Sequence, residues 1–215
     1  MPDSTRDRAH QGRDKRGLIL ESAIKVFART GYHGSRVSDI AREAGIAYGL
    51  VYHYFKNKEE ILETIFEEQW SGFLGAVDAI ADGSSATEDK LLSIAGLILN
   101  AYRVRTDWVK VLVFEIQRSP RFRNPDQIRA ISRLFQIVAR ILRDGQKAGE
   151  LRDDLDPDIA CYVFIGGLDI VVTSRVLELI EIEPGTPDEA QYHLKVARTM
   201  VDLFLNGIRN PEGDS

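Results

Sequence analysis

Apolar residues recur at the spacing of an α-helix along almost the whole chain, and this pattern limits the fold more than any other feature of the sequence. Leu20, Ala23, Ile24 and Phe27 lie at positions i, i+3, i+4 and i+7 of one segment, so they share one face of a helix. The run Val-Leu-Val-Phe at 111–114 could form a strand, but it has no hairpin partner and no neighbour of alternating polarity. The sequence therefore predicts an all-α fold.

Residues that start and end helices divide this pattern into nine helices. Gly31 and Gly45 each follow a periodic segment, where glycine commonly ends a helix with a positive φ. Asn57, Asp156 and Thr186 are polar residues at the starts of later segments, where side-chain oxygens cap a helix. After a first helix that ends at residue 30, the predicted helices cover residues 37–44, 46–54, 57–80, 87–102, 107–118, 126–148, 157–180 and 187–208.

The charges are distributed unevenly along the chain. The net charge of −5 by itself argues against nucleic acid. However, residues 1–58 hold 11 lysines and arginines against 6 acidic residues, whereas residues 59–215 hold 17 against 27. A basic end on an acidic chain is typical of proteins that meet DNA with one end only. The alternative is a basic disordered arm over residues 6–16, but basic residues continue through the periodic segment at positions 25, 29, 36, 42, 56 and 58.

Two short predicted helices, 37–44 and 46–54, are joined by a tight turn at Gly45. Two amphipathic helices joined in this way form a helix-turn-helix, although many small helical pairs share the spacing. The wider sequence is more specific, with GYHGSRVSDIA at 31–41, AGIAYGLVYHYFKNK at 44–58 and EIL at 60–62. It resembles the DNA-binding signature of the TetR family of bacterial repressors. The rest of the chain resembles this family only in the number and length of its helices.

The resemblance implies that the exposed start of the third helix enters the major groove of DNA. Tyr48 and Leu50 can pack on thymine methyl groups, although the family usually has polar or basic residues at these positions. Ser35 and Arg36 lie at the entry to the second helix, where side chains and backbone amides can hold a phosphate. Lys58 lies in the first turn of a helix, where a cation is unfavourable, so we expect a phosphate partner. The full set of expected DNA contacts is Ser35, Arg36, Val37, Ala47, Tyr48, Gly49, Leu50, Tyr52, His53, Tyr54 and Lys58.

The resemblance also implies two domains and a homodimer. The N-terminal arm and a three-helix DNA-binding domain cover residues 1–57, and a helical ligand-binding and dimerisation domain covers residues 58–215. The predicted helix 157–180 has more apolar surface than a monomer can bury. Gly166-Gly167 in its middle lowers the helix propensity, which indicates that another helix packs closely against these glycines. The alternative is that the glycines leave room for a ligand. A dimer would present two copies of the third helix to a pseudo-palindromic operator. The expected interface residues are Val163, Gly166, Gly167, Ile170, Val171 and Leu203.

A second cluster of positive charge lies between Arg103 and Arg143, where ten lysines and arginines stand against three acidic residues. Apolar helices flank this cluster, so an anionic head group on an apolar tail would match both features. The sequence EIQRS at 115–119 resembles the fatty-acid-degradation repressors of the family, which respond to long-chain acyl-coenzyme A, although Gln117 replaces an expected arginine. The alternative is that the arginines form a solvated helix face. The expected ligand contacts are Tyr102, Trp108, Phe114, Gln117, Arg118, Arg121, Phe122, Arg129, Arg133, Phe164 and Asp169.

Other functions have less support in the sequence. There is no nucleophile–base pair and no phosphate-binding glycine loop to indicate an enzyme. Glu115 and Asp169 could hold a cationic lipophile, as in multidrug-sensing relatives of the family, but the excess of arginine argues against such a ligand. Loss of DNA binding is disfavoured because Tyr48 and Lys58 are retained. The sequence does not separate a repressor from an activator, because that depends on where the operator lies.

We expect no cofactor, no metal ion and no membrane partner. The four histidines and the single cysteine, Cys161, have no metal-ligand spacing. One cysteine excludes an internal disulfide and is typical of a reducing compartment. The N-terminus lacks the apolar stretch of a secretory signal, and no apolar run approaches the roughly 20 residues that cross a bilayer. We therefore expect a cytoplasmic DNA-binding repressor that a hydrophobic effector releases from its operator.

Overall fold

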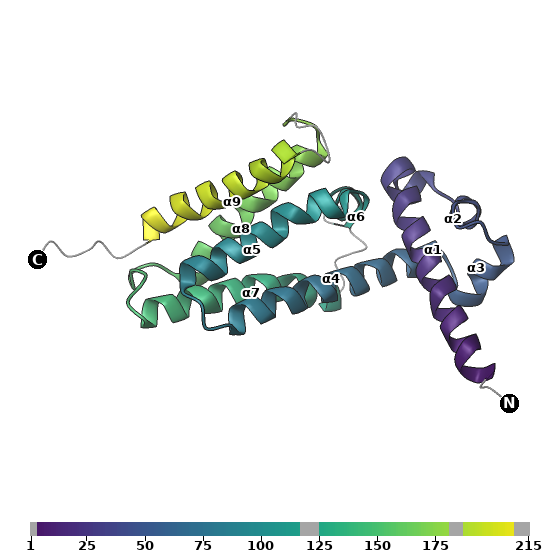
Figure 1. Ribbon diagram of the computed structural model, residues 1–215, viewed down its shortest axis with the longest axis horizontal. Coiled ribbons are helices and arrows are strands. Elements are labelled where there is room, and N and C mark those ends of the chain that lie inside the picture. Colours follow the sequence, from purple (N-terminus) through teal and green to yellow (C-terminus); the bar gives the residue numbers. More distant parts are fainter. Residues whose placement is uncertain (1–3, 117–124, 181–186, 209–215) are drawn as a thin grey trace, which may run out of the picture. The chain divides into compact units, whose positions relative to one another are not determined.

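The computed structural model of the chain describes residues 4–116, 125–180 and 187–208. These ranges contain nine α-helices and no β-strand (Figure 1), which confirms the all-α prediction. The helices are α1 (Ser4–Gly34), α2 (Val37–Glu43), α3 (Tyr48–Tyr54), α4 (Lys58–Asp82), α5 (Thr87–Val104), α6 (Thr106–Val111), α7 (Pro125–Lys147), α8 (Pro157–Val176) and α9 (Pro187–Ile208), and the π-helix η1 (Leu112–Ile116) follows α6.

The chain forms two compact units. Among the described residues, the first unit consists of 4–70 and 107–116, and the second consists of 71–106, 125–180 and 187–208. α4 therefore belongs to both units, whereas the boundary predicted between residues 57 and 58 assigns all of α4 to the second domain. The first half of α4 belongs with the helix-turn-helix because its apolar side chains, with Ile61 among them, are fully buried there.

The first three helices form the predicted helix-turn-helix arrangement. α1 packs on α2, and α2 packs on α3. Phe27 of α1, Ile40 of α2 and Val51 of α3 are each no more than 1% exposed, so each helix buries its apolar face within the first unit. Gly45 joins α2 to α3 with a φ of 64°, which a residue with a Cβ rarely adopts. The glycine turn predicted from the sequence is confirmed.

Several helix bounds differ from the prediction. α1 begins at Ser4 and includes the segment for which a disordered arm was the alternative. Gly31 interrupts α1 with a φ of 71°, but a further short helical turn follows it, so the helix does not end at residue 30. The helix predicted over 107–118 divides into α6 and the π-helix η1. α8 ends at Val176, because Glu178 just after it has a φ of 58° and leaves the helical path.

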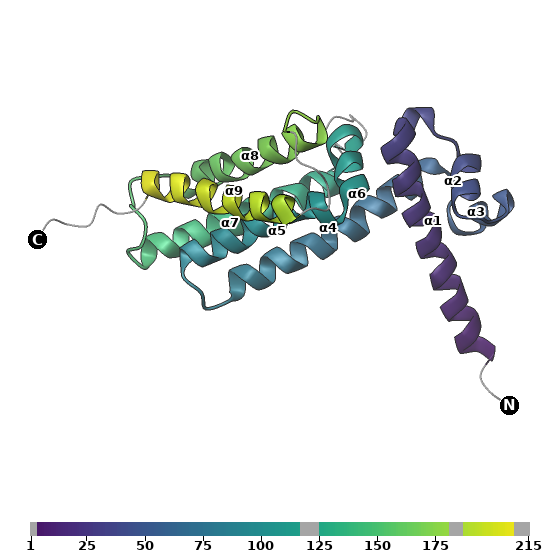
Figure 2. The same ribbon diagram turned by 45° about the horizontal axis from the view of Figure 1, so that its top comes forward.

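α5 is the central helix of the second unit. It packs on α7, α8 and α9, and α8 also packs on α7 and α9 (Figure 1, Figure 2). Leu91, Ile94 and Leu99 of α5 are each no more than 1% exposed, as expected for a helix that is apolar nearly all round. Ile137 of α7 and Phe164 of α8 are also buried in this core.

α8 is the most apolar helix of the described ranges. By length and composition it could cross a bilayer, with a mean hydropathy of 1.6 over an 18-residue window that is 39% buried. The core helix of a soluble protein meets the same criteria, so this is weak evidence for a membrane span. A Cβ added to Gly167 would lie 2.5 Å from Met200 Cε of α9, whereas a Cβ on Gly166 would have no atom within 4 Å. Gly167 therefore allows α8 and α9 to pack within one protomer, while Gly166 lies on the outer face.

Candidate functional site

The outer face of α3 carries most of the side chains expected to contact DNA. Val51, which is 1% exposed, anchors α3 to the rest of the first unit. The backbone of Ala47, the N-cap residue, is extended, and the start of α3 lies at the surface. The exposed residues are Ala47, Tyr48, Gly49, Tyr52 and His53, and the half-buried ones are Leu50 and Tyr54. A helix anchored by one buried residue between exposed neighbours has the form required to enter a major groove.

Tyr48 and Tyr52 form a pair on this outer face. Their hydroxyl oxygens are 2.9 Å apart, and their rings meet edge to face with centroids separated by 5.2 Å. The hydrogen bond with Tyr48 raises the pKa of Tyr52, so the phenol stays protonated at neutral pH. The two side chains, 53% and 45% exposed, therefore present one rigid aromatic surface with hydroxyl groups at its edge. The i, i+4 spacing is the sequence signal for such a pair.

Ser35, expected to contact a phosphate, has its side chain buried in the turn between α1 and α2. The residue is 3% exposed, and its Oγ donates a hydrogen bond to the Tyr32 carbonyl oxygen at 2.7 Å. Ser35 therefore closes the turn between α1 and α2. The Arg36 backbone N–H is also occupied, because it donates to Asp39 Oδ2 at 2.9 Å. The Arg36 side chain is exposed, and Val37 beside it is half-buried.

Lys58 has partners within the chain, and these account for its position without a phosphate. Its Nζ donates to the carbonyl oxygens of Tyr32 and Ser35, the latter at 2.7 Å. The same Nζ lies 4.2 Å from the centroid of the Tyr32 ring. Carbonyl groups near the C-terminal end of a helix such as α1 attract a cation. Lys58 therefore stabilises the α1–α2 turn, directly before the exposed Arg36.

Glu115 of η1 binds the same turn. Its Oε1 accepts a hydrogen bond from the Tyr32 backbone N–H at 3.0 Å, and this oxygen would lie 3.3 Å from a Cβ on Gly31. The sequence places Glu115 within a family-like motif, but it does not show that this carboxylate reaches a residue 83 positions earlier. The hydrogen bond joins the segment that follows α6 to the end of α1 within the first unit.

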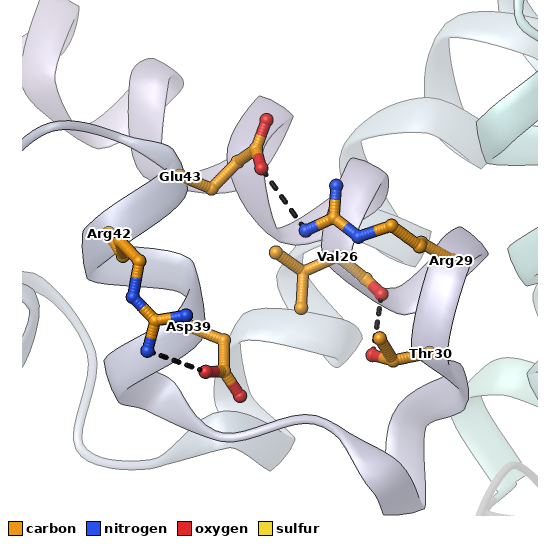
Figure 3. A pocket seen from close by; sticks show the side chains of 6 residues that line it. All are labelled: Val26, Arg29, Thr30, Asp39, Arg42 and Glu43. Carbon is orange, nitrogen blue, oxygen red and sulfur yellow. Dashed lines mark hydrogen bonds and ion pairs between the residues drawn. The ribbon is translucent and has the colours of Figure 1, made fainter.

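A hollow of about 350 Å³ lies between α1 and α2 in the first unit (Figure 3). Arg29 pairs with Glu43 at 3.2 Å, and Arg42 pairs with Asp39 at 3.1 Å. The lining residues are Val26, Arg29, Thr30, Asp39, Arg42 and Glu43. Because four of the six lining side chains are charged and form two ion pairs, the hollow does not resemble a site for an acyl chain.

The residues expected to contact an effector are distributed over both units. Tyr102 and Phe164 are buried in the second unit, whereas Trp108 is buried in the first. Phe114 is 39% exposed, and Asp169 lies on the exposed side of α8 rather than in the core. Gln117, Arg118, Arg121 and Phe122 lie outside the described residues.

The arginines of α7 are paired with acidic residues. Arg133 contacts Asp78 at 3.0 Å, and Arg140 contacts Asp78 at 3.5 Å and Asp82 at 2.9 Å. Arg129 pairs with an aspartate one turn before it in α7. The side chains of Arg133 and Arg140 are 49% and 42% exposed. These arginines match the alternative of a solvated face, and an anionic head group that binds here must compete with Asp78 and Asp82.

Large apolar side chains are exposed along α8 and α9. At least half of the surface of each of the following is exposed: Ile159, Tyr162, Val163 and Ile170 of α8, and Leu194 and Leu203 of α9. Among the other residues predicted at a dimer interface, Gly166 is exposed, and Gly167 and Val171 are half-buried. Exposed apolar groups on two neighbouring helices are typical of an interaction surface.

α5, α8 and α9 contain a buried polar cluster that the sequence analysis missed. Arg175 and Glu189, 4% and 2% exposed, form an ion pair at 3.1 Å. Arg175 Nη1 also donates to the Ile180 carbonyl oxygen at 2.8 Å, and the guanidinium lies 5.3 Å from the centroid of the Tyr102 ring. His193, one turn after Glu189 in α9, is 6% exposed. The only signal in the sequence is that these polar residues interrupt apolar helix faces.

Two family models match consecutive parts of the chain. Residues 19–65 match the model described as bacterial regulatory proteins, tetR family, and residues 66–196 match that described as YsiA-like protein, C-terminal region.

Individual relatives match over nearly the full length of the chain. The fatty acid metabolism regulator protein of Bacillus subtilis (strain 168) is 28% identical over 200 residues, which cover 93% of this chain and 98% of that protein. The transcriptional repressor KstR2 of Mycobacterium tuberculosis (strain H37Rv) is 32% identical over 207 residues, which cover 93% and 96%. The crystal structure of the transcriptional regulator FadR from Bacillus subtilis in complex with stearoyl-CoA has a TM-score of 0.74 and 26% identity, and the match covers 89% of this chain and 98% of that chain.

These relatives are transcription regulators rather than enzymes, which agrees with the sequence prediction. The second family model alone spans more than half of the chain, and the first covers the helix-turn-helix and the outer face of α3. The chain therefore belongs to the TetR family of bacterial regulatory proteins, and its relatives include the fatty-acid regulators that the sequence resembles.

Proposed function

We propose that this protein is a homodimeric repressor that leaves its operator when a long-chain acyl-coenzyme A binds its second unit. The outer face of α3 is the observation that carries DNA binding, because Val51 anchors the helix and Tyr48 and Tyr52 extend from it. The effector is supported by the relatives, which include a fatty acid metabolism regulator and a FadR solved with stearoyl-CoA.

Release follows from the geometry that a dimer needs. Two copies of α3 must reach successive major grooves roughly 34–36 Å apart. The exposed apolar residues of α8 and α9 supply a surface to hold two protomers together, and α4 runs through both units. An effector weakens operator binding only by the difference between its affinities for the DNA-bound and the released conformations.

A steroid-derived effector is the second candidate. The KstR2 repressor of Mycobacterium tuberculosis is 32% identical to this chain, and its solved structure, with a TM-score of 0.72, is described as a ketosteroid transcriptional regulator. A cationic lipophile has less support, because Glu115 accepts a hydrogen bond from Tyr32 and Asp169 lies on the exposed side of α8.

Displacement from DNA by acyl-coenzyme A tests the proposal. An operator selected by the protein from a random duplex library is labelled, and binding is followed by fluorescence anisotropy. Saturating palmitoyl-CoA or stearoyl-CoA should lower operator affinity by about 5- to 150-fold. Palmitate and free coenzyme A, each of which carries one part of the ligand, should leave it unchanged. If calorimetry gives no heat with either acyl-coenzyme A and operator binding survives both, the effector is another compound; release by a ketosteroid would then favour the second candidate.

Tyr48→Ala should change the preferred operator more than it weakens DNA binding in general. The substitution removes the aromatic surface that Tyr48 and Tyr52 share, and a specific base contact contributes about 1–3 kcal/mol of discrimination. Operator selection repeated with the variant measures this change. Tyr48→Phe keeps the ring and should retain the preference for thymine at the contacted position. An unchanged operator in the Tyr48→Ala selection would mean that α3 does not read the bases.

Lys58→Ala should weaken binding to all DNA sequences about equally and leave the salt dependence unchanged. The ammonium group stabilises the α1–α2 turn through the Tyr32 and Ser35 carbonyls, so its loss should also lower the free energy of unfolding by about 1–2 kcal/mol. Arg36→Ala is the matched comparison, because it removes an exposed cation and should reduce the salt slope by about 1. If Lys58→Ala reduces the slope as much as Arg36→Ala, Lys58 contacts a phosphate, as the sequence analysis predicted.

A further inference from the structure

His193 lies in the interior of the second unit. The residue is 6% exposed, and neither its Nδ1 nor its Nε2 has a hydrogen-bond partner among the residues that the structure describes. Buried polar atoms in folded proteins almost always have a partner in the protein, in a bound water or in a ligand. Two such atoms on one buried ring therefore point to a group from outside the chain.

The charged groups around His193 come from three helices. They are Arg103 of α5, Arg175 of α8 and Glu189 of α9, and Tyr102 lies beside Arg175. Burial lowers the pKa of His193, the Glu189 carboxylate opposes this effect, and the two arginines add to it. His193 is therefore neutral at neutral pH, with one N–H donor and one nitrogen acceptor.

The charge balance of the cluster limits what can bind there. Arg175 and Glu189 form an ion pair in the buried cluster and neutralise each other. Arg103 is exposed and donates a hydrogen bond to Asn100 at 2.8 Å, so it lies outside this buried pair. A ligand carboxylate next to His193 would add a second negative charge beside Glu189, in an interior where an uncompensated charge is costly. A neutral hydrogen-bond acceptor meets no such repulsion.

We propose that His193 binds the acyl end of the effector, with its N–H donating to the thioester carbonyl oxygen. This assignment rests on the proposed function, since it takes an acyl-coenzyme A as the effector. In this proposal, His193 is the residue that distinguishes an acyl thioester from other long-chain compounds. Neither the sequence motifs nor the arginines of α7 indicated this residue.

Removal of one oxygen atom from the ligand tests the assignment. S-hexadecyl-CoA is a thioether with a methylene in place of the carbonyl of palmitoyl-CoA, and calorimetry on the full-length protein gives both affinities. The parent protein should bind the thioester about tenfold more tightly than the thioether, as expected for one buried hydrogen bond. His193→Leu should bind the two ligands equally. His193→Gln, which keeps a donor and an acceptor, should recover part of the preference, and Gln191→Ala at an exposed position of α9 should retain all of it.

The melting temperature without ligand separates recognition from a structural role. His193→Leu removes two unpartnered buried polar atoms, so it should melt about 2–4 °C higher than the parent. If the parent binds both ligands equally, or if His193→Leu keeps the preference for the thioester, His193 does not contact the carbonyl and the assignment is wrong, while regulation by acyl-coenzyme A stands. A lower melting temperature with the preference retained would show a structural role instead. If neither ligand gives heat, the proposed effector fails, and this assignment fails with it.

Discussion

Replacing Val163 with glutamate should convert the proposed dimer into monomers and weaken operator binding at least about a hundredfold. Val163 is 65% exposed in the protomer and lies among the exposed apolar residues of α8 and α9. Full burial of an apolar side chain of this size contributes about 1.5–3 kcal/mol. A two-fold interface contains every residue twice, so one substitution places two unpaired carboxylates in it. A monomer carries one α3, and the second half-site then no longer contributes to affinity.

Light scattering coupled to size-exclusion chromatography measures the oligomeric state, and anisotropy with the selected operator measures affinity. Ile128→Glu is the matched control, because Ile128 is an apolar residue of α7 that is 49% exposed and lies outside α8 and α9. This control should stay dimeric and bind the operator like the parent. A Val163→Glu protein that remains dimeric at the same concentration would mean that the protomers associate through another surface.

Arg175→Met should lower the free energy of unfolding by about 3–5 kcal/mol, because it removes the guanidinium that pairs with the buried Glu189 carboxylate. The two side chains are 4% and 2% exposed and lie 3.1 Å apart, so water cannot replace the lost interaction. Urea unfolding followed by circular dichroism measures this loss.

Removal of both charges shows whether the loss of stability comes from the broken ion pair or from the loss of side-chain packing. The double variant Arg175→Met with Glu189→Leu should regain most of the lost stability, since an apolar pair of similar volume has no charge to desolvate. Arg143→Met is the control, because Arg143 pairs with Asp158 at the surface, where an ion pair is worth about 1 kcal/mol or less. If the double variant is as unstable as Arg175→Met alone, the uncompensated carboxylate is not the cause of the loss.

The prediction from sequence succeeded where a feature depends on residues close together in the chain. Gly45 has the predicted positive φ, and the helix-turn-helix and its family were identified from one contiguous stretch. The outer face of α3 could be anticipated because one apolar residue, Val51, lies between residues that a helix places outward. The intramolecular hydrogen bonds of Ser35 and Lys58 could not be anticipated for the opposite reason, since both side chains bond to carbonyl groups of a turn whose shape the sequence pattern does not show.

The sequence by itself determined the helices, the glycine turn and the residues that α3 exposes, because hydrophobic periodicity and local backbone preference act over a few positions. Only the tertiary structure decided which charged and polar groups pair with one another. Arg133 pairs with Asp78, which is 55 positions away in the sequence, and Glu115 accepts a hydrogen bond from the Tyr32 amide, 83 positions away. Arg175 pairs with Glu189 inside the core. A helical pattern tells on which face a side chain lies, but not which other helix covers that face. The partner of a buried or paired charge is therefore fixed only when the helices pack.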